Sequence, residues 1–209
     1  MVKAIFLDLG GVIIDLDFNA AINAFREIAG FERIGEFLDP FIQKGFIAEM
    51  ERGKIGEQEF YDRCRPYCRP GVTDKELSDS FGALLVGIRP EKVEYLRELS
   101  ARYPLYMLSN INPVAMRHCY RIFAESGLPV KEYYKGMFLS YEMKMMKPDH
   151  EIFLEAARRA GVEPSEVLFV DDSSKNVAAA AELGFKTVVL PQNGNLRAAV
   201  EAALEEYGR

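Results

Sequence analysis

Polar side chains that can do chemistry stand at three places in this sequence, each directly after a short apolar run. Asp8 follows the first run, Ser109 and Asn110 end the second, and Asp171 and Asp172 end the third. The runs are rich in β-branched and aromatic residues, which is typical of strands buried on both faces. Because the carboxyl ends of parallel strands share one edge of a sheet, we expect these side chains to meet there.

The three carboxylates of this group, Asp8, Asp171 and Asp172, would repel one another at a shared edge. Each would have a raised pKa unless a cation were present. A divalent ion with oxygen ligands, most naturally Mg²⁺, relieves the repulsion, and Lys147 adds one positive charge. A single aspartate after a strand is often only a turn or cap residue, so the joint pattern carries the prediction of a metal site.

Neutral groups near these carboxylates suit a phosphate. Ser109 and Asn110 offer hydrogen-bond donors for phosphate oxygens, and Gly10 and Gly11 let the main chain approach a ligand closely. An acidic nucleophile, a metal and an anion cradle together indicate phosphoryl transfer through an aspartyl-phosphate.

The elements that must position these residues are predicted by hydrophobic patterning. Helical patterns separate the buried strands and stop near Gly161 and Gly184. This alternation predicts an α/β fold, a doubly wound, Rossmann-like parallel sheet with helices on both sides. The four expected strands are residues 3–7, 105–108, 167–170 and 187–190.

The stretch from about residue 17 to residue 85 shows no strand pattern, only helical ones. Phe18 begins a helical spacing of apolar residues, and Thr73 and Glu76 form a capping box. We therefore expect an α-helical cap domain at residues 17–86, the cap segment, inserted into a core of residues 1–16 and 87–209. Such an insertion lies above the ligand crevice of an α/β fold, so it either covers the site or is merely structural.

Composition restricts the partners. The 209 residues are 49% hydrophobic and 28% charged, which is typical of a globular protein, and the formal net charge is −6. An acidic chain lacks the basic surface that nucleic acid or an anionic membrane requires. No apolar run reaches the roughly 18–20 residues of a membrane span, and three cysteines are not a disulfide framework. We expect a cytoplasmic protein whose partner is a small phosphorylated metabolite; the sequence makes no prediction of oligomeric state.

The sequence resembles the haloacid dehalogenase (HAD) superfamily. Four motifs in order carry the resemblance: FLDLGGVI at residues 6–13, LSN at 108–110, LSYE at 139–142 followed by Lys147-Pro148, and FVDD at 169–172 with Asn176. Within the superfamily it resembles the members with a helical cap, such as bacterial α-D-glucose-1-phosphate phosphatases and the phosphatase domain of soluble epoxide hydrolase. The cap stretch at 51–55 with Phe60 resembles theirs too.

The resemblance implies a role for each site residue. Asp8 attacks phosphorus and, with Asp172 and the backbone carbonyl of Gly10, binds Mg²⁺ directly. Asp171 holds the metal through water and pairs with Lys147. The phosphoryl group is bound by Ser109 and Lys147 with help from Asn110, and Asn176 orients its neighbours. The implied activity is hydrolysis of a small phosphomonoester, α-D-glucose 1-phosphate being the favoured example.

One position departs from the family pattern. Most phosphatases of the superfamily carry a second aspartate, the general acid and base, where this sequence has Gly10. Three hypotheses follow: a phosphatase that is slow or restricted to good leaving groups, a non-catalytic binding protein, and a metal-free 2-haloacid dehalogenase. The acidic pair Asp171-Asp172 disfavours the last.

Other charged residues have an ordinary explanation beside a functional one. Asp15 and Asp17 are candidate replacement acids, although junction carboxylates are commoner. Arg52 and Lys54 could reach an anionic substrate, although solvated charges are commoner.

Overall fold

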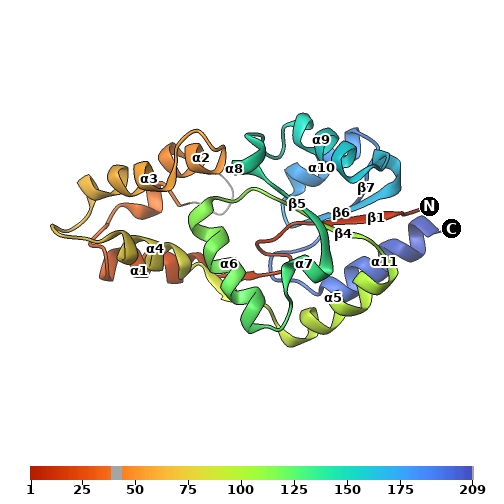
Figure 1. Cartoon of the computed structure of the whole chain (residues 1–209), viewed down its shortest axis with the longest axis horizontal. Coiled ribbons are helices and arrows are strands. Elements are labelled where there is room, and N and C mark those ends of the chain that lie inside the picture. The colour runs from red at the N-terminus through yellow and green to blue at the C-terminus, as the bar shows by residue number, and fades with distance from the viewer. Residues whose placement is uncertain (39–43, 209) are drawn as a thin grey trace.

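The computed structural model describes residues 1–38 and 44–208 of the chain. Its centre is a parallel sheet in the order β5-β4-β1-β6-β7, with helices on both faces and a helical segment projecting beyond one end (Figure 1). The strands are β1 (Ala4–Leu7), β4 (Leu105–Ser109), β5 (Tyr134–Leu139), β6 (Val167–Asp171) and β7 (Lys186–Val189). The predicted α/β class is confirmed.

The central strand β1 is completely buried, and alternate side chains face opposite sides of the sheet. Ile5 and Leu7 belong to one apolar cluster, whereas Ala4 and Phe6 belong to another. This two-sided burial explains why the strand reads as a continuous apolar run. It also fixes the direction of Asp8, which follows the strand at its carboxyl end.

Helices cover both faces of the sheet (Figure 1). One face carries α5 (Pro90–Arg102), α6 (Pro113–Glu125), α7 (Val130–Tyr133) and α11 (Leu196–Gly208); the other carries α9 (His150–Ala160) and α10 (Ser174–Glu182). Gly161 caps α9 with φ +70°, and Gly184 follows α10 with φ +89°. Both predicted helix ends are therefore confirmed, because glycine adopts this left-handed conformation at little cost.

Short elements complete the chain. The helix α8 (Ser140–Met143) follows β5, and three 3₁₀ turns lie at η1 (Ile34–Glu36), η2 (Arg65–Tyr67) and η3 (Pro164–Glu166). Within residues 1–38 and 44–208, no helix has the length and apolar character to cross a bilayer.

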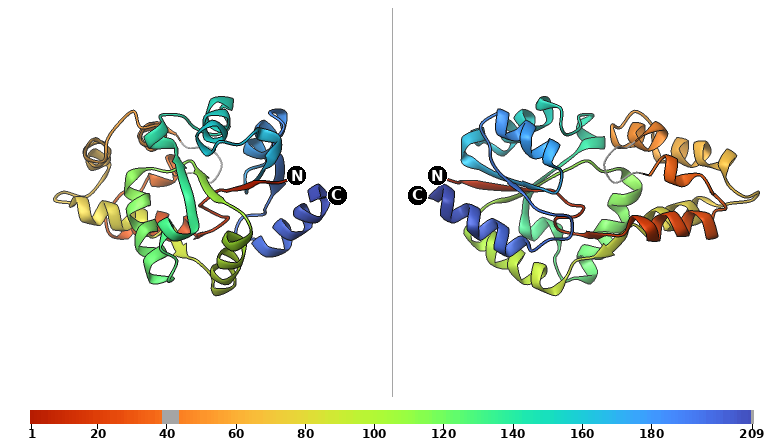
Figure 2. Two further views of the ribbon diagram at one scale, coloured as in Figure 1. Left: turned by 45° about the vertical axis from the view of Figure 1, so that its right-hand side comes forward. Right: turned by 180° about the vertical axis from the view of Figure 1, so that it is seen from behind.

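The cap segment contains four helices, and five of its residues, 39–43, lie outside the described chain. The helices are α1 (Phe18–Glu27), α2 (Gly45–Glu51), α3 (Glu57–Cys64) and α4 (Asp74–Gly82). They project from the end of the sheet opposite both termini (Figure 2). The capping box of Thr73 and Glu76 begins α4, as predicted.

Two features differ from the expectation of four strands. The strand β5 was not expected, because it lies at the sheet edge, pairs only with β4, and contains Lys135 and Gly136, which weaken a strand pattern. A two-stranded antiparallel ribbon of β2 (Asp15–Leu16) and β3 (Leu85–Gly87) was also not expected. Strands of two and three residues are too short to show a period, yet they join the core to the cap segment.

Candidate active site

The three carboxylates gather at the carboxyl edge of the sheet. Leu7 of β1 pairs with Val170 of β6, so Asp8 and Asp171 occupy adjacent positions beyond that pair. The Asp8 amide donates to the Val170 carbonyl at 2.9 Å, which continues the ladder into the site. Carboxylate oxygens of Asp8, Asp171 and Asp172 all lie within 4.8 Å of one another. The predicted meeting of the strand ends is therefore present.

Lys147 is the cation of this cluster and is buried, with 2% of its surface exposed. Its ammonium lies 3.0 Å from Asp8 Oδ1 and 2.5 Å from Asp171 Oδ2, and it donates to the Leu108 carbonyl at 2.9 Å. These three contacts use all three ammonium donors. Burial lowers the pKa of Lys147, but the charges of Asp171 and Asp8 outweigh burial, so the net shift is upward. The direction of this shift favours the charged form of the lysine.

Two asparagines hold the charged residues in place. The Asn110 side chain donates to the Lys147 carbonyl and accepts from the Lys147 amide, both at 2.8 Å. The Asn176 amide donates to both oxygens of Asp171, at 3.0 and 3.2 Å. Asn176 thus restrains the carboxylate of Asp171, and its supporting role in the site stays a prediction. Asn110 is engaged with the lysine main chain, and its help in phosphate binding stays a prediction, as does the phosphate contact of the buried Ser109.

Gly11 lets Asp172 approach the first loop. Gly11 has φ +74°, and a Cβ at this position would lie 2.2 Å from Asp172 Oδ2. A side chain here is excluded by both the backbone conformation and the space. Gly10 differs, because its Cβ would meet only the tip of Leu16, at 3.0 Å. The absence of an acid at position 10 is therefore not forced by close packing against main chain.

Two of the acids have strongly raised pKa values. Burial raises the pKa of Asp8 to about 6; the charge of Lys147 opposes this shift, and the charge of Asp171 adds to it. Burial, then the charges of Asp8 and Asp171, raise the pKa of Asp172 to about 7. Three carboxylates facing one ammonium form an oxygen-rich, negatively charged pocket, which fits a hard divalent cation. The donor set therefore suits Mg²⁺.

A fourth acid, Glu51, approaches from the cap segment and was not among the expected site residues. It ends α2 and is 6% exposed. Burial, then the charge of Asp8, raise its pKa to about 8. In the sequence it stands before Arg52 and Gly53 like any solvated helix-end glutamate, so nothing there marks it as buried.

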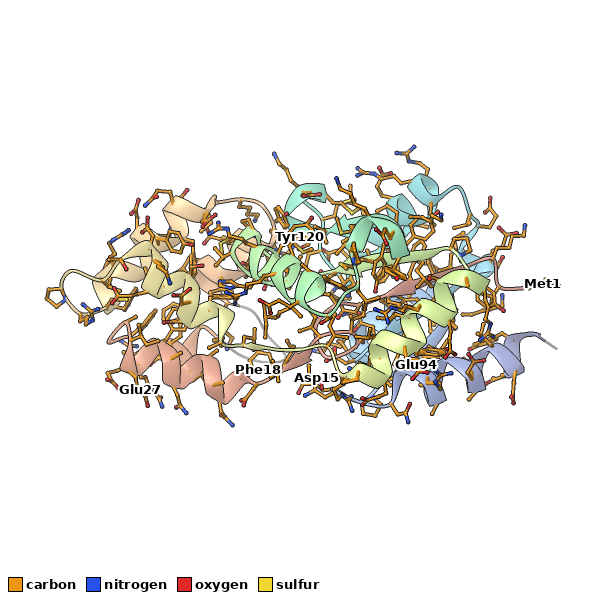
Figure 3. The ribbon with its side chains drawn as sticks, turned by 60° about the horizontal axis from the view of Figure 1, so that its bottom comes forward. Met1, Asp15, Phe18, Glu27, Glu94 and Tyr120 are labelled. Carbon is orange, nitrogen blue, oxygen red and sulfur yellow. The ribbon has the colours of Figure 1, made fainter. Side chains whose placement is uncertain are left out.

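The other charged candidates lie outside the cluster. Asp15 pairs with Lys92 and Arg89, each at 2.7 Å, and Asp17 caps α1 through the Ala20 amide at 3.0 Å. Both therefore act at the junction with the cap segment, where Figure 3 labels Asp15 beside the start of α1.

The two basic candidates of the cap segment also point elsewhere. Arg52 pairs with Asp149 of the core at 3.3 Å, and Lys54 is exposed.

Comparison with known proteins identifies the family. The family model of haloacid dehalogenase-like hydrolases matches residues 2–184. A D-ribitol-5-phosphate phosphatase of Bacteroides thetaiotaomicron is 36% identical over 195 residues, which cover 93% of this chain and 94% of that protein. The similarity therefore extends over nearly the whole length of both chains.

Solved structures agree with the sequence relatives. A HAD family enzyme from Bacteroides thetaiotaomicron, in complex with magnesium and inorganic phosphate, has a TM-score of 0.86 and 35% identity, covering 93% of this chain and 97% of its own. A predicted HAD-like family hydrolase from Porphyromonas gingivalis has a TM-score of 0.83 and 35% identity, with 93% of each chain covered.

Proposed function

The chain belongs to the haloacid dehalogenase-like hydrolases, and from this premise we propose that it is a Mg²⁺-dependent phosphatase that hydrolyses a small phosphomonoester. The observation that carries the proposal is the buried cluster in which Lys147 contacts both Asp8 and Asp171 while Asp172 lies beside them. A D-ribitol-5-phosphate phosphatase among the relatives and a magnesium and phosphate complex among the structural neighbours support it.

The chemistry assigns Asp8 as nucleophile. Its carboxylate attacks phosphorus, and the displaced alcohol leaves on the opposite side of the phosphoryl group. Lys147, fixed between Asp8 and Asp171, is placed to neutralise charge on the transferring oxygens. Water then hydrolyses the aspartyl-phosphate and restores Asp8.

Four residues would hold the metal, three of them directly and one through water. Asp8 and Asp172, with the carbonyl of Gly10, are the proposed ligands, and Asp171 would hold it through water. When bound, Mg²⁺ supplies positive charge to the phosphoryl oxygens and relieves the repulsion among the carboxylates. Asn176 and Gly11 support this set because one orients Asp171 and the other admits Asp172.

The substrate is proposed to be a phosphate ester of a sugar or polyol in the cytoplasm. The sequence resemblance favours α-D-glucose 1-phosphate, whereas the relative with 36% identity is named for D-ribitol 5-phosphate. The cap segment, which we propose forms a separate domain of residues 17–86, would select between such substrates because it lies above the strand ends.

The excess of carboxylates disfavours the dehalogenase alternative. A 2-haloacid is itself a carboxylate, and without a metal the acids of this pocket would repel it. A phosphate bridged to the protein by Mg²⁺ has no such penalty.

The test is phosphate release from a panel of metabolites by the purified protein, with Mg²⁺ and with excess EDTA. The panel contains D-ribitol 5-phosphate, α-D-glucose 1-phosphate and p-nitrophenyl phosphate, with Asp8→Asn run in parallel. Mg²⁺-dependent turnover that Asp8→Asn lacks is expected. Absence of turnover on every ester would contradict the proposal, and chloride release from 2-chloropropionate without metal would favour dehalogenation.

A further inference from the structure

The proposed phosphatase lacks a proton donor on its first loop, because Gly10 stands where the family usually has an acid. The departing alkoxide of an ordinary alcohol requires a proton, and general acid–base help is typically worth ~10²–10⁴ in rate. Neither sequence candidate for the donor is free to act. Asp15 is held by two cations, and Asp17 is committed to capping α1.

The main chain around Glu51 is fixed against the core at three successive residues. The Ser140 hydroxyl accepts from the Ile111 amide at 3.0 Å and donates to the Glu51 carbonyl at 2.7 Å. Arg52 pairs with Asp149 of the core. Gly53, with φ +63°, lies so close to Tyr141 that an added Cβ would be 2.2 Å from its carbonyl oxygen. The end of α2 is therefore held over the strand ends.

Among the residues that the structure describes, the buried Glu51 carboxyl forms no ion pair, and the charge of Arg52 lowers its pKa by less than burial and the charge of Asp8 raise it. Its nearest basic neighbour in sequence, Arg52, pairs with Asp149 instead. Within the described part of the chain, the buried atom Oε2 of this carboxyl has no hydrogen-bond partner. A buried carboxyl without a cation favours its protonated form, because an uncompensated buried charge is costly. The pocket thus contains a neutral acid with an unused oxygen.

The position of Glu51 suits a leaving group. Asp8 attacks from the sheet edge, so the departing oxygen lies on the far side of phosphorus, facing the cap segment. Glu51 comes from that segment, and through the Ser140 hydroxyl its carbonyl is joined to the amide of Ile111, two residues beyond the end of β4. We propose that Glu51 is the catalytic acid and base of this enzyme, in place of the carboxyl that Gly10 lacks; this inference rests on the proposed phosphatase function.

The two steps balance with one proton moving each way. As a bond forms between Asp8 Oδ and phosphorus, the bond from phosphorus to the ester oxygen breaks. Its electron pair stays on that oxygen, which takes the proton of Glu51 and leaves as the alcohol. In the second step, water gives its proton to the Glu51 carboxylate and its oxygen bonds to phosphorus. The acyl-phosphate bond breaks, which restores Asp8 and releases phosphate.

The test compares leaving groups in Glu51→Gln, a variant of nearly the same shape that cannot transfer the proton. The ratio kcat/KM reports the first chemical step, in which the alcohol departs. For an alkyl ester such as D-ribitol 5-phosphate, kcat/KM should fall about 10²–10⁴-fold. For p-nitrophenyl phosphate, whose leaving group needs no proton, it should fall less than about tenfold. The matched control is Glu49→Gln, because Glu49 lies on the same helix and pairs with Arg63 at the surface. Its kcat/KM values for the alkyl ester and for p-nitrophenyl phosphate should both stay at the parent level.

Two results would overturn the assignment. Equal losses on both esters in Glu51→Gln indicate a structural role, and an unchanged ratio on the alkyl ester indicates no role. Should Glu51→Gln not fold, Glu51→Asp keeps an acid on a shorter side chain. Because the shorter acid reaches the leaving oxygen less well, its kcat/KM should fall more for the alkyl ester than for p-nitrophenyl phosphate, and equal losses on both esters would contradict the proposal. A parent protein inactive on every ester would instead refute the phosphatase function itself.

Discussion

Two buried lysines, Lys147 and Lys92, show how the same residue makes a reactive site in one region and a structural joint in another. Each has 2% of its surface exposed, and each contacts a carboxylate within 3.0 Å. Around Lys147, three carboxylates face one ammonium. Around Lys92, the single carboxylate of Asp15 faces both Lys92 and Arg89.

The net pKa shifts of the two lysines therefore have opposite signs. Burial lowers the pKa of Lys92, and Asp15 only partly opposes this while Arg89 adds to it. Burial also lowers the pKa of Lys147, but the charges of Asp171 and Asp8 together outweigh it and raise the pKa. Around Lys147 the buried negative charge exceeds the positive charge, which suits the binding of a metal cation and, through it, an anionic substrate. Around Lys92 the charges of Lys92 and Arg89 balance Asp15, and this cluster holds the core and the cap segment together.

The largest expected effect separates the two clusters by activity. We expect Asp8→Asn to lower kcat at least ~10⁴-fold, because the nucleophile is lost. Asp15→Asn should leave kcat nearly intact, since Asp15 contacts only cations of the junction. Phosphate release under saturating Mg²⁺ measures both. A hundredfold loss in Asp15→Asn would contradict the contrast and make Asp15 part of the chemistry.

The second effect concerns metal. Adding Mg²⁺ at about 100 times its Kd should stabilise the parent by about 2.7 kcal/mol, which raises Tm by about 5–10 °C for a chain of this size. Asp15→Asn should show the same rise in Tm on adding Mg²⁺. Asp172→Asn should show little of this rise, because a proposed metal ligand is lost. Thermal melts in EDTA and in Mg²⁺ decide this. A full shift in Asp172→Asn would place the ion elsewhere.

The third effect is a dependence of stability on pH in the metal-free protein. The folded pKa values of Asp8 and Asp172, about 6 and about 7, lie above the ordinary 3.8. The folded state therefore binds protons at these two carboxyl groups more tightly than the unfolded state does. Their contribution to the free energy of unfolding is complete below pH 3.8 and is lost as the pH rises to about 7. The loss should be on the order of a few kcal/mol.

Melts in EDTA across that range measure the loss, and two comparisons sharpen it. Asp8→Asn should melt higher than the parent in EDTA at pH 7.5, because it removes one of the repelling charges. Saturating Mg²⁺ should flatten the parent's profile. If metal-free stability rose with pH over this window instead, the unbalanced charge assigned to this cluster would be wrong.

The smallest expected effect falls on the junction. Lys92→Met should lower the free energy of unfolding by about 2 kcal/mol, because the buried lysine is lost while Asp15 keeps Arg89. Its kcat should stay within about threefold of the parent. Urea unfolding and phosphate release on the same sample test both halves. A large loss of kcat without loss of stability would show that the junction acts in catalysis.

Much of the sheet and the core of the site could be predicted because the signals are local. Strands buried on both faces read as apolar runs, and a parallel sheet brings their ends together, so Asp8, Asp171 and Asp172 could be grouped before any coordinates were available. Lys147 was placed with them as a balancing charge. The edge strand β5 and the ribbon of β2 and β3 were missed, because short or half-exposed strands have weak periodicity.

Asp15 and Glu51 show where local signals end. Both are acidic residues close to helical patterns in the sequence, and only Asp15 was considered there as a replacement acid. In the folded chain, Asp15 lies next to Lys92, 77 residues away, whereas Glu51 is buried and forms no ion pair with the residues that the structure describes. The environment of a carboxyl group depends on which distant segments surround it, and a linear pattern does not contain that information.

The sequence by itself determined the α/β class, the helix ends at Gly161 and Gly184, and the residues that follow the buried strands, since burial and backbone preference act over a few neighbouring positions. Only the tertiary structure decided which charges are balanced and which are not. Asp15 contacts two cations, whereas the three strand-end carboxylates share one. Glu51 of the cap segment is buried and has no ion-pair partner in the described part of the chain. Charge balance is a sum over groups close in space, and the packing of distant segments sets that sum.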